Sequence, residues 1–284
     1  MKRLAARALG RAAPSALRWL AHRNPIKRGR WPLLDALNCD PQCREWLSGL
    51  ENPTRTRRGF RLFTIPGDLT SDFIKLHGQH EAGTEEFILD HLEPGYTFLD
   101  IGANIGYFSL LAAIAGHVKS VAFEPQGPVA ELLARSADFN GVSGMVRVER
   151  FALSDAPASM KMTSCPGNTG HAQLADPGDE GDKACRVPVL ALDDWLRANP
   201  VGRVSVCKID TEGTELRVLR GMQELLARDA PAIVIEVIDD LLGDFGVSGP
   251  QVLGLLGALG YREVSGDYTS KGDCNRYLIK ERRA

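Results

Sequence analysis

The sequence predicts an α/β protein built on a doubly wound parallel sheet, and three observations lead to this fold class. Short apolar segments alternate with helical segments from residue 97 to residue 259. The first apolar segment ends in an acid and continues through a glycine-punctuated turn into an apolar helix. The second also ends in an acid. With 284 residues, of which 44% are hydrophobic and 25% charged, the chain is long enough to enclose one sizeable core.

Hydrophobic periodicity places the elements in order along the chain. The segments expected before the sheet are a helix at 33–50, a strand at 59–65, the start of a helix within 70–76 and a helix at 85–92. The alternating part has strands at 97–100, 120–123, 146–152, 204–209 and 232–237, and helices at 107–115, 129–139, 215–227 and 252–259. Two additional short strands, 159–162 and 187–190, flank a loop at 163–186, and 261–264 with 276–279 reads as a final hairpin.

Charge is divided unevenly along the chain. The first 30 residues contain nine Lys and Arg and no acid. The whole chain carries −2 and this segment +9, so the remainder carries −11. We therefore expect a basic, partly helical extension at 1–58 and one domain at 59–284. The acidic body argues against a nucleic-acid partner, whereas the basic residues 1–30 leave contact with an anionic membrane surface open.

The sequence predicts a cytoplasmic location. No apolar run approaches the roughly 20 residues that span a bilayer. The N-terminal stretch is interrupted by Arg7, Arg11, Pro14 and Arg18, so it lacks the apolar region of a signal peptide. The six cysteines are scattered, as is typical of reduced thiols. Attachment to the inner face of the membrane through the basic segment stays open, and nothing in the sequence indicates an oligomeric state.

The first motif with chemical meaning is the glycine turn Asp100-Ile-Gly102-Ala-Asn104-Ile-Gly106. Gly102 and Gly106 permit tight turning and close approach of a ligand to the backbone. The N-terminus of the following helix favours a carboxylate or a phosphate. Asn104 stands where the dinucleotide pattern G-x-G-x-x-G would have its second close glycine. A nicotinamide-dependent oxidoreductase is therefore the weaker of the two enzyme classes that this turn suggests.

Glu124 is the second candidate for a ligand-binding residue. It ends the apolar segment Ser-Val-Ala-Phe, and Pro125 is placed to begin the next helix. An acid at the end of the second strand is positioned to hydrogen-bond a ribose diol. The plain alternative is that Asp100 and Glu124 only cap helices, and the occurrence of both acids at strand ends makes this alternative weaker.

A third motif, Lys208-Ile-Asp210-Thr-Glu212-Gly213, follows the expected strand at 204–209. Taken with the two strand-end motifs and with Ile-Val-Ile-Glu236, it resembles the FkbM family of S-adenosylmethionine-dependent O-methyltransferases. The resemblance covers roughly residues 81–280 and follows the order of the family. It implies a Rossmann-like class I methyltransferase sheet of seven strands, parallel except for one, that ends in an antiparallel hairpin and binds its ligand at the carboxyl edge.

The resemblance also implies where S-adenosylmethionine would lie. Its methionine carboxylate would rest over the glycine turn, with Asp100 facing the methionine amino group and Glu124 taking both ribose hydroxyls. Two residues after the third strand would give adenine a backbone contact and an apolar wall. Glu81 either reaches the cofactor or caps a helix. The residues expected at the cofactor are Glu81, Asp100, Gly102, Asn104, Gly106, Glu124, Ala152 and Leu153.

The acceptor side has two candidate regions. The loop at 165–173 is long enough to be functional, and His171 within it is a candidate general base, although a surface histidine is the commoner case. Asp210 and Glu236 end neighbouring strands, so both carboxylates should reach the same crevice. A divalent metal between them is one interpretation. The metal-free alternative, with Lys208 or water neutralising the acids, is favoured because no third ligand is evident.

The sequence therefore predicts an enzyme that methylates a hydroxyl of a sugar, a glycan or a secondary metabolite. Asp210, His171 and Lys208 are the candidate catalytic residues, and Asp210 and Glu236 the candidate metal ligands. The rival hypotheses are the nicotinamide-dependent oxidoreductase and a non-catalytic, membrane-associated module that keeps the cofactor fold. The Asp210-x-Glu212 segment argues against the second rival.

Overall fold

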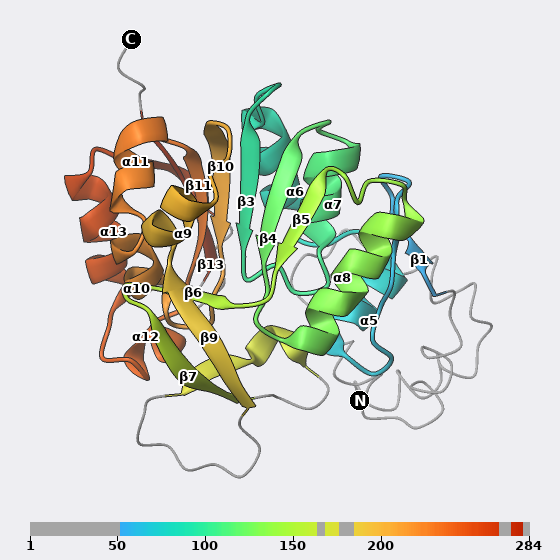
Figure 1. Ribbon diagram of the computed structural model, residues 1–284, viewed down its shortest axis with the longest axis horizontal. Helices are drawn as coiled ribbons and strands as arrows, with labels where there is room; N and C mark the ends of the chain where they lie inside the picture. The colour runs from blue at the N-terminus through green and yellow to red at the C-terminus, as the bar shows by residue number, and fades with distance from the viewer. Residues whose placement is uncertain (1–51, 164–167, 176–184, 267–273, 281–284) are drawn as a thin grey trace, which may run out of the picture.

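The computed structural model describes residues 52–163, 168–175, 185–266 and 274–280 (Figure 1). The expected helix at 33–50 and the basic residues 1–30 lie outside the described residues, so the boundary of the extension and its membrane contact remain predictions. The elements before the sheet are β1 (Thr54–Arg55), β2 (Arg61–Leu62), α5 (Leu69–His77) and α6 (Ala82–His91). Only two residues of the expected strand at 59–65 are extended, and they pair with β1.

The main sheet has seven strands in the order β12-β13-β11-β10-β3-β4-β5. In chain order these are β3 (Thr97–Ile101), β4 (Lys119–Phe123), β5 (Val146–Glu149), β10 (Val204–Ile209), β11 (Ala232–Val237), β12 (Arg262–Gly266) and β13 (Cys274–Ile279). The five strands from β11 to β5 are parallel, and β13 is antiparallel to both of its neighbours. The expected doubly wound sheet with its C-terminal hairpin is confirmed.

Helices cover both faces of the sheet (Figure 1). The remaining helices are α7 (Tyr107–Ile114), α8 (Gly127–Phe139), α9 (Leu192–Ala198), α10 (Glu215–Arg220), α11 (Gln223–Asp229), α12 (Asp239–Gly243) and α13 (Gly249–Ala258). Alternate strand residues enter two separate cores, because successive side chains of a strand point to opposite faces. Leu99 and Phe123 pack with α9, α10, α11 and α13, whereas Phe98 and Ala122 pack with α6, α7 and α8.

A second, smaller sheet overturns one expected strand. The segment 146–152 is not continuous: β5 ends at Glu149, and β6 (Ala152–Ser154) joins β9 (Cys185–Ala191), β7 (Ala158–Thr163) and β8 (Gln173–Ala175). The chain leaves the main sheet where Phe151 packs against Phe123 and Trp195, with ring centroids 5.5 and 6.3 Å apart. This aromatic contact is tertiary, so the local pattern does not reveal it.

The expected helix at 215–227 is also interrupted, between α10 and α11. A Cβ added at Gly221 would lie 2.0 Å from the carbonyl oxygen of Ser154, so the backbone of α10 ends directly against β6. The carbonyl of Gly221 accepts the N–H of Asp193, and the Asp193 carboxylate accepts the N–H groups of Glu224 and Leu225. These bonds begin a new helix at α11. None of the described helices is long and apolar enough to cross a membrane.

Candidate functional site

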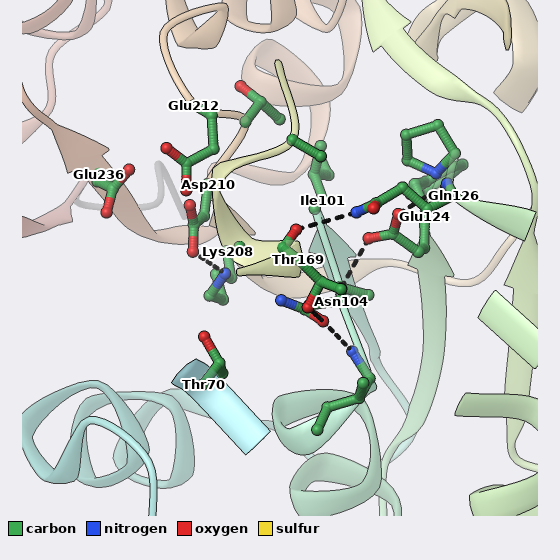
Figure 2. Close-up of a pocket in the computed structure, with 18 of the residues that line it drawn as sticks. Thr70, Ile101, Asn104, Glu124, Gln126, Thr169, Lys208, Asp210, Glu212 and Glu236 are labelled. Carbon is green, nitrogen blue, oxygen red and sulfur yellow. Dashed lines mark hydrogen bonds and ion pairs between the residues drawn. The ribbon is translucent and has the colours of Figure 1, made fainter. Parts of the chain in front are cut away.

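A cavity of about 300 Å³ opens where the parallel strands end. The segments that follow β3, β4 and β10 supply its walls, together with Glu236 of β11 and residues of the small sheet (Figure 2). Apolar clefts with a few convergent polar groups at such strand ends are the usual ligand sites of doubly wound sheets. The sequence-predicted residues that line this cavity are Glu81, Gly102, Asn104, Glu124, Ala152, Leu153, Lys208, Asp210 and Glu236.

The glycine turn joins β3 to the cavity wall. Gly102 and Gly106 have φ values of 77° and 87°, in the left-handed region that favours glycine. A Cβ added at Gly102 would lie 1.8 Å from the carbonyl oxygen of Asp210, and one added at Gly106 would lie 2.3 Å from Cγ of Leu133. The close approaches that require these glycines are therefore to the end of β10 and to α8. The turn and Asp210 thus form one compact backbone unit.

Glu124 is held in place by the backbone on either side of it. Its Oε2 accepts the N–H of Asn104 at 2.9 Å, and its Oε1 accepts the N–H of Gln126 at 2.8 Å. The residue is 3% exposed, and burial raises the pKa of its carboxyl to about 7 despite these two bonds. Gln126 is the N-cap residue of α8, so Glu124 also supports a helix start. Each carboxylate oxygen retains a second lone pair for a ligand.

A chain of charged groups runs from the sheet to the cavity. Asp100 is fully buried; its Oδ2 accepts the hydroxyl of Ser109 at 2.6 Å, and its Oδ1 has no hydrogen-bond partner. Asp100 pairs in register with Lys208, whose Nζ donates to Oδ2 of Asp210 at 2.7 Å. Burial raises the pKa of Asp100, and the nearby ammonium opposes this. Burial lowers the pKa of Lys208, but Asp210 and Asp100 together raise it above its ordinary value. Lys208 is therefore a buried cation between two acids.

Three acids meet at the far side of the cavity from Glu124 (Figure 2). One carboxylate oxygen from each of Asp210, Glu212 and Glu236 lies within 4.8 Å of the others. Burial, and then the charge of Asp210, raises the pKa of Glu212 to about 9 and that of Glu236 well above its usual range. Glu212 belongs to the motif that follows β10 but is not among the metal ligands predicted from the sequence. Its backbone has φ 54°. No third ligand is evident from the sequence, and the structure brings Glu212 beside Asp210 and Glu236.

Of three further predicted site residues, Glu81 lies at the cavity, Asp100 does not line it, and the side chain of His171 is not described. Glu81 is the N-cap residue of α6, but among the described residues its side chain makes no capping hydrogen bond. Its Oε2 instead accepts a hydrogen bond from Nδ2 of Asn275 at 2.8 Å. Asp100 is not among the described residues that line the cavity. His171 belongs to the short 3₁₀ helix η1 (Thr169–His171), but its side chain lies outside what the structure describes. Its role as a base therefore remains a prediction.

Sequence reasoning assigned no individual role to several polar residues in or beside the cavity, among them Thr169 of the candidate loop at 165–173. Thr70, Gln126 and Thr169 line the cavity, and Asp68 holds Thr169. Gln126 stands two residues after Glu124 in the sequence. Its position just after a strand-end acid could have predicted that it lies at the cavity. Asp68 and Thr169 are 101 residues apart along the chain, and no local pattern connects them.

Comparisons with known proteins agree with this geometry. The sequence model of the family described as Methyltransferase FkbM domain matches residues 100–263, more than half of the chain. The AMB antimetabolite synthetase AmbE of Pseudomonas aeruginosa is 31% identical over 184 residues, covering 52% of this chain and 9% of that protein. The 31-O-demethyl-FK506 methyltransferase FkbM of Streptomyces tacrolimicus is 29% identical over 223 residues, covering 65% of this chain and 81% of that protein.

A third relative is the hexuronic acid methyltransferase AglP of Haloferax volcanii, 24% identical over 158 residues, which cover 55% of this chain and 62% of that protein. The chain thus spans less than two thirds of the length of AmbE and of AglP. The family match includes the glycine turn, Glu124, Asp210 and Glu236. It favours methyl transfer over the nicotinamide chemistry that the glycine turn left open. The chain belongs to the FkbM family of methyltransferases.

Proposed function

We propose that this methyltransferase transfers the methyl group of S-adenosylmethionine to a hydroxyl oxygen of a sugar, a glycan or a secondary metabolite. The observation that carries the proposal is the placement of Glu124 and Asp210 on opposite sides of one cavity. The first is suited to a nucleoside and the second to a hydroxyl. Two relatives are named for methylation of an FK506 precursor at an oxygen and of a hexuronic acid, which supports the acceptor class.

The cofactor would lie along the glycine turn. The first N–H groups of α7 would hold its carboxylate, because the helix dipole favours an anion there. Glu124, whose carboxylate is already oriented by two backbone N–H groups, would accept both ribose hydroxyls. Ala152 and Leu153, which line the cavity from the small sheet, form the wall for adenine. Asp100 acts through Lys208 and the turn, since it does not itself line the cavity.

Methyl transfer requires alignment and the removal of one proton. The acceptor oxygen attacks the methyl carbon, the carbon–sulfur bond breaks as the carbon–oxygen bond forms, and the electron pair of the broken bond neutralises the sulfonium. Asp210 accepts the hydroxyl proton. Lys208 orients the Asp210 carboxylate through the 2.7 Å contact with Oδ2, so that Oδ1 is left for the acceptor. His171 is the alternative base.

A divalent cation would be compatible with the acidic cluster. Asp210, Glu212 and Glu236 provide three oxygen donors close enough to share an ion, and Mg²⁺ and Ca²⁺ prefer such ligands. A bound cation would lower the pKa of an acceptor hydroxyl. Against this, Lys208 already compensates Asp210. We therefore propose transfer without a metal.

Removal of metal provides a direct test of this choice. Because transfer is proposed to need no metal, activity is expected to stay within about twofold of the untreated protein after treatment with EDTA and dialysis. A cation that polarises the reacting oxygen would supply several kcal/mol, so its removal would lower the rate far more than twofold. Initial rates of label transfer from radiolabelled S-adenosylmethionine measure the effect. Loss of activity in EDTA that Mg²⁺ or Ca²⁺ restores would instead assign the cluster to a metal.

Cofactor binding should depend on pH through Glu124. The ionised carboxylate accepts ribose hydroxyls better than the acid does, and the pKa of Glu124 in the unliganded protein is about 7. The ionised fraction therefore rises about tenfold between pH 6 and pH 8. The Kd for S-adenosylhomocysteine, measured by titration calorimetry, should fall by a similar factor as pH rises. Glu124→Gln should bind weakly at both pH values. If its pH profile matched that of the wild type, another group would be responsible.

The proposed function as a whole is tested with purified protein, radiolabelled S-adenosylmethionine and hydroxylated acceptors such as neutral hexoses, hexuronic acids and macrolide alcohols. Label in the acceptor supports it. Absence of both cofactor binding and label transfer would refute it, whereas binding without transfer to any acceptor would favour the non-catalytic module.

A further inference from the structure

Residues 168–170 form a turn that is tied to three other segments beside the cavity (Figure 2). The N–H and Oγ1 of Thr169 both donate to Oδ2 of Asp68, at 2.6 and 3.0 Å. The same Oγ1 lies 3.2 Å from Oδ1 of Asn104. The carbonyl of Thr169 accepts Nε2 of Gln126 at 3.0 Å. A single residue thus joins the start of α5, the glycine turn and the segment after β4.

Asp68 is built to hold this turn. It is 1% exposed and caps α5, where its Oδ1 accepts the N–H of Ser71 at 2.9 Å. Its Oδ2 is left for Thr169, so the two carboxylate oxygens have separate partners. The turn also packs tightly on α5, since a Cβ added at Gly170 would lie 3.3 Å from Oγ1 of Thr70. The hydroxyl of Thr169 carries one hydrogen, and an ionised carboxylate is a stronger acceptor for it than an amide.

The partners of the turn are also the partners of Glu124. Asn104 and Gln126 donate their backbone N–H groups to the two oxygens of that carboxylate, while their side chains bind Thr169. A nucleoside held by Glu124 must therefore lie against the residues that fasten the turn. A change in the position of the turn would act on the same residues that orient Glu124.

We propose that residues 168–170 are a clasp, fastened by Asp68, that closes over the nucleoside half of the bound cofactor and slows its release. The inference rests on the proposed function, because it takes the occupant of the cavity to be S-adenosylmethionine or its product. Asp68 and Thr169 are positioning residues: they act on the cofactor through the clasp and through Asn104 and Gln126. Such a closure protects the reactive sulfonium from water between binding and transfer.

Three variants separate the contacts of the clasp. Thr169→Val removes the hydroxyl with little change of shape, and Thr169→Ser keeps it. Asp68→Asn offers one acceptor oxygen where the wild type has two, so it can cap α5 or hold Thr169 but not both. The matched control is Asp193→Asn, which weakens another carboxylate that accepts two backbone N–H groups, at the junction of α9 and α11 and outside the cavity lining.

The measurement is the dissociation rate of radiolabelled S-adenosylhomocysteine, followed by rapid filtration after mixing the preformed complex with an excess of unlabelled S-adenosylhomocysteine. Thr169→Val and Asp68→Asn should each release it about tenfold faster, because each loses a hydrogen bond that involves a charged group. Thr169→Ser should remain within about twofold of the wild type, since its hydroxyl retains the bond. The Asp193→Asn rate should equal the wild-type rate even where its unfolding temperature is lower.

The outcomes distinguish the inference from the proposal beneath it. Wild-type binding with unchanged release from Thr169→Val and Asp68→Asn would overturn the clasp and leave the proposed function intact. Faster release that is matched by Asp193→Asn would also overturn it, because general destabilisation would then be the cause. Wild-type protein that binds no S-adenosylhomocysteine would refute the proposed function and the clasp together.

Discussion

Asp210→Asn should reduce the rate of methyl transfer by a factor on the order of 10² to 10⁴, the usual contribution of a positioned general base. An amide cannot take the acceptor proton, although it has almost the same shape. The affinity for S-adenosylmethionine should change by no more than about threefold, because a group that acts on the acceptor contributes mainly to the transition state. The effect should therefore appear in kcat and leave the cofactor Kd nearly unchanged.

This split is measured by single-turnover transfer at saturating cofactor, with cofactor binding determined separately. The substitution leaves the buried ammonium of Lys208 without its carboxylate partner, so the unfolding temperature is recorded in parallel. Glu212→Gln is the matched control, since it changes a neighbouring acid of the same cluster and keeps the Asp210 carboxylate to which Lys208 donates. A fully active Asp210→Asn enzyme would remove Asp210 from the mechanism and leave His171 as the base to test.

Glu124→Ala should weaken binding of S-adenosylmethionine by at least about tenfold, because a hydrogen bond to a charged group contributes about 1.5–3 kcal/mol and two are lost. Transfer at saturating cofactor should be less affected, since the reacting atoms lie on the other side of the cavity. Equilibrium binding of S-adenosylmethionine and initial rates at high cofactor concentration measure the two effects.

The control for this experiment concerns the second role of Glu124, which is to support the N-terminus of α8. Its carboxylate also accepts the N–H of Gln126 at the start of α8, so loss of the helix cap alone would lower the unfolding temperature without changing affinity. Affinity equal to that of the wild type in Glu124→Ala, with a lower unfolding temperature, would show that the residue is only a cap. The pH dependence of the Kd of Glu124→Gln is an independent check. A Kd that no longer changes between pH 6 and pH 8 supports binding by Glu124, and a Kd that changes as in the wild type supports a cap alone.

Much of the fold could be predicted because its strands follow simple local rules. The strands β3, β4, β10 and β11 are short and apolar on both faces, which is typical of buried parallel strands. The places where prediction failed depend on contacts between distant residues. Phe151 turns the chain out of the main sheet by packing on Trp195, and Gly221 ends α10 because Ser154 lies directly against it. Neither neighbour is visible in the local pattern.

The residues of the site also fall into those that local sequence predicts and those that depend on backbone conformation or distant contacts. Acids that end strands could be placed at one edge of the sheet from sequence alone, since the carboxyl ends of parallel strands meet there. Glu212 could not, because its contribution depends on a left-handed backbone at a non-glycine position. The fastening of Thr169 by Asp68 was likewise beyond reach, since it joins the loop between β7 and β8 to the cap of α5.

The contact of Gly102 with the carbonyl of Asp210 has a geometric consequence for the proposed reaction. Transfer requires the methyl carbon and the attacking oxygen to approach to about 3–3.5 Å. The turn would carry the donor and Asp210 the acceptor, and main-chain atoms in direct contact set the gap between them. Apart from Asp210 itself, exchanging side chains around the cavity would not adjust this spacing. An acceptor of different size would have to be accommodated by side chains that line the cavity away from this contact, which makes those side chains the place to redesign specificity while the reacting distance stays fixed.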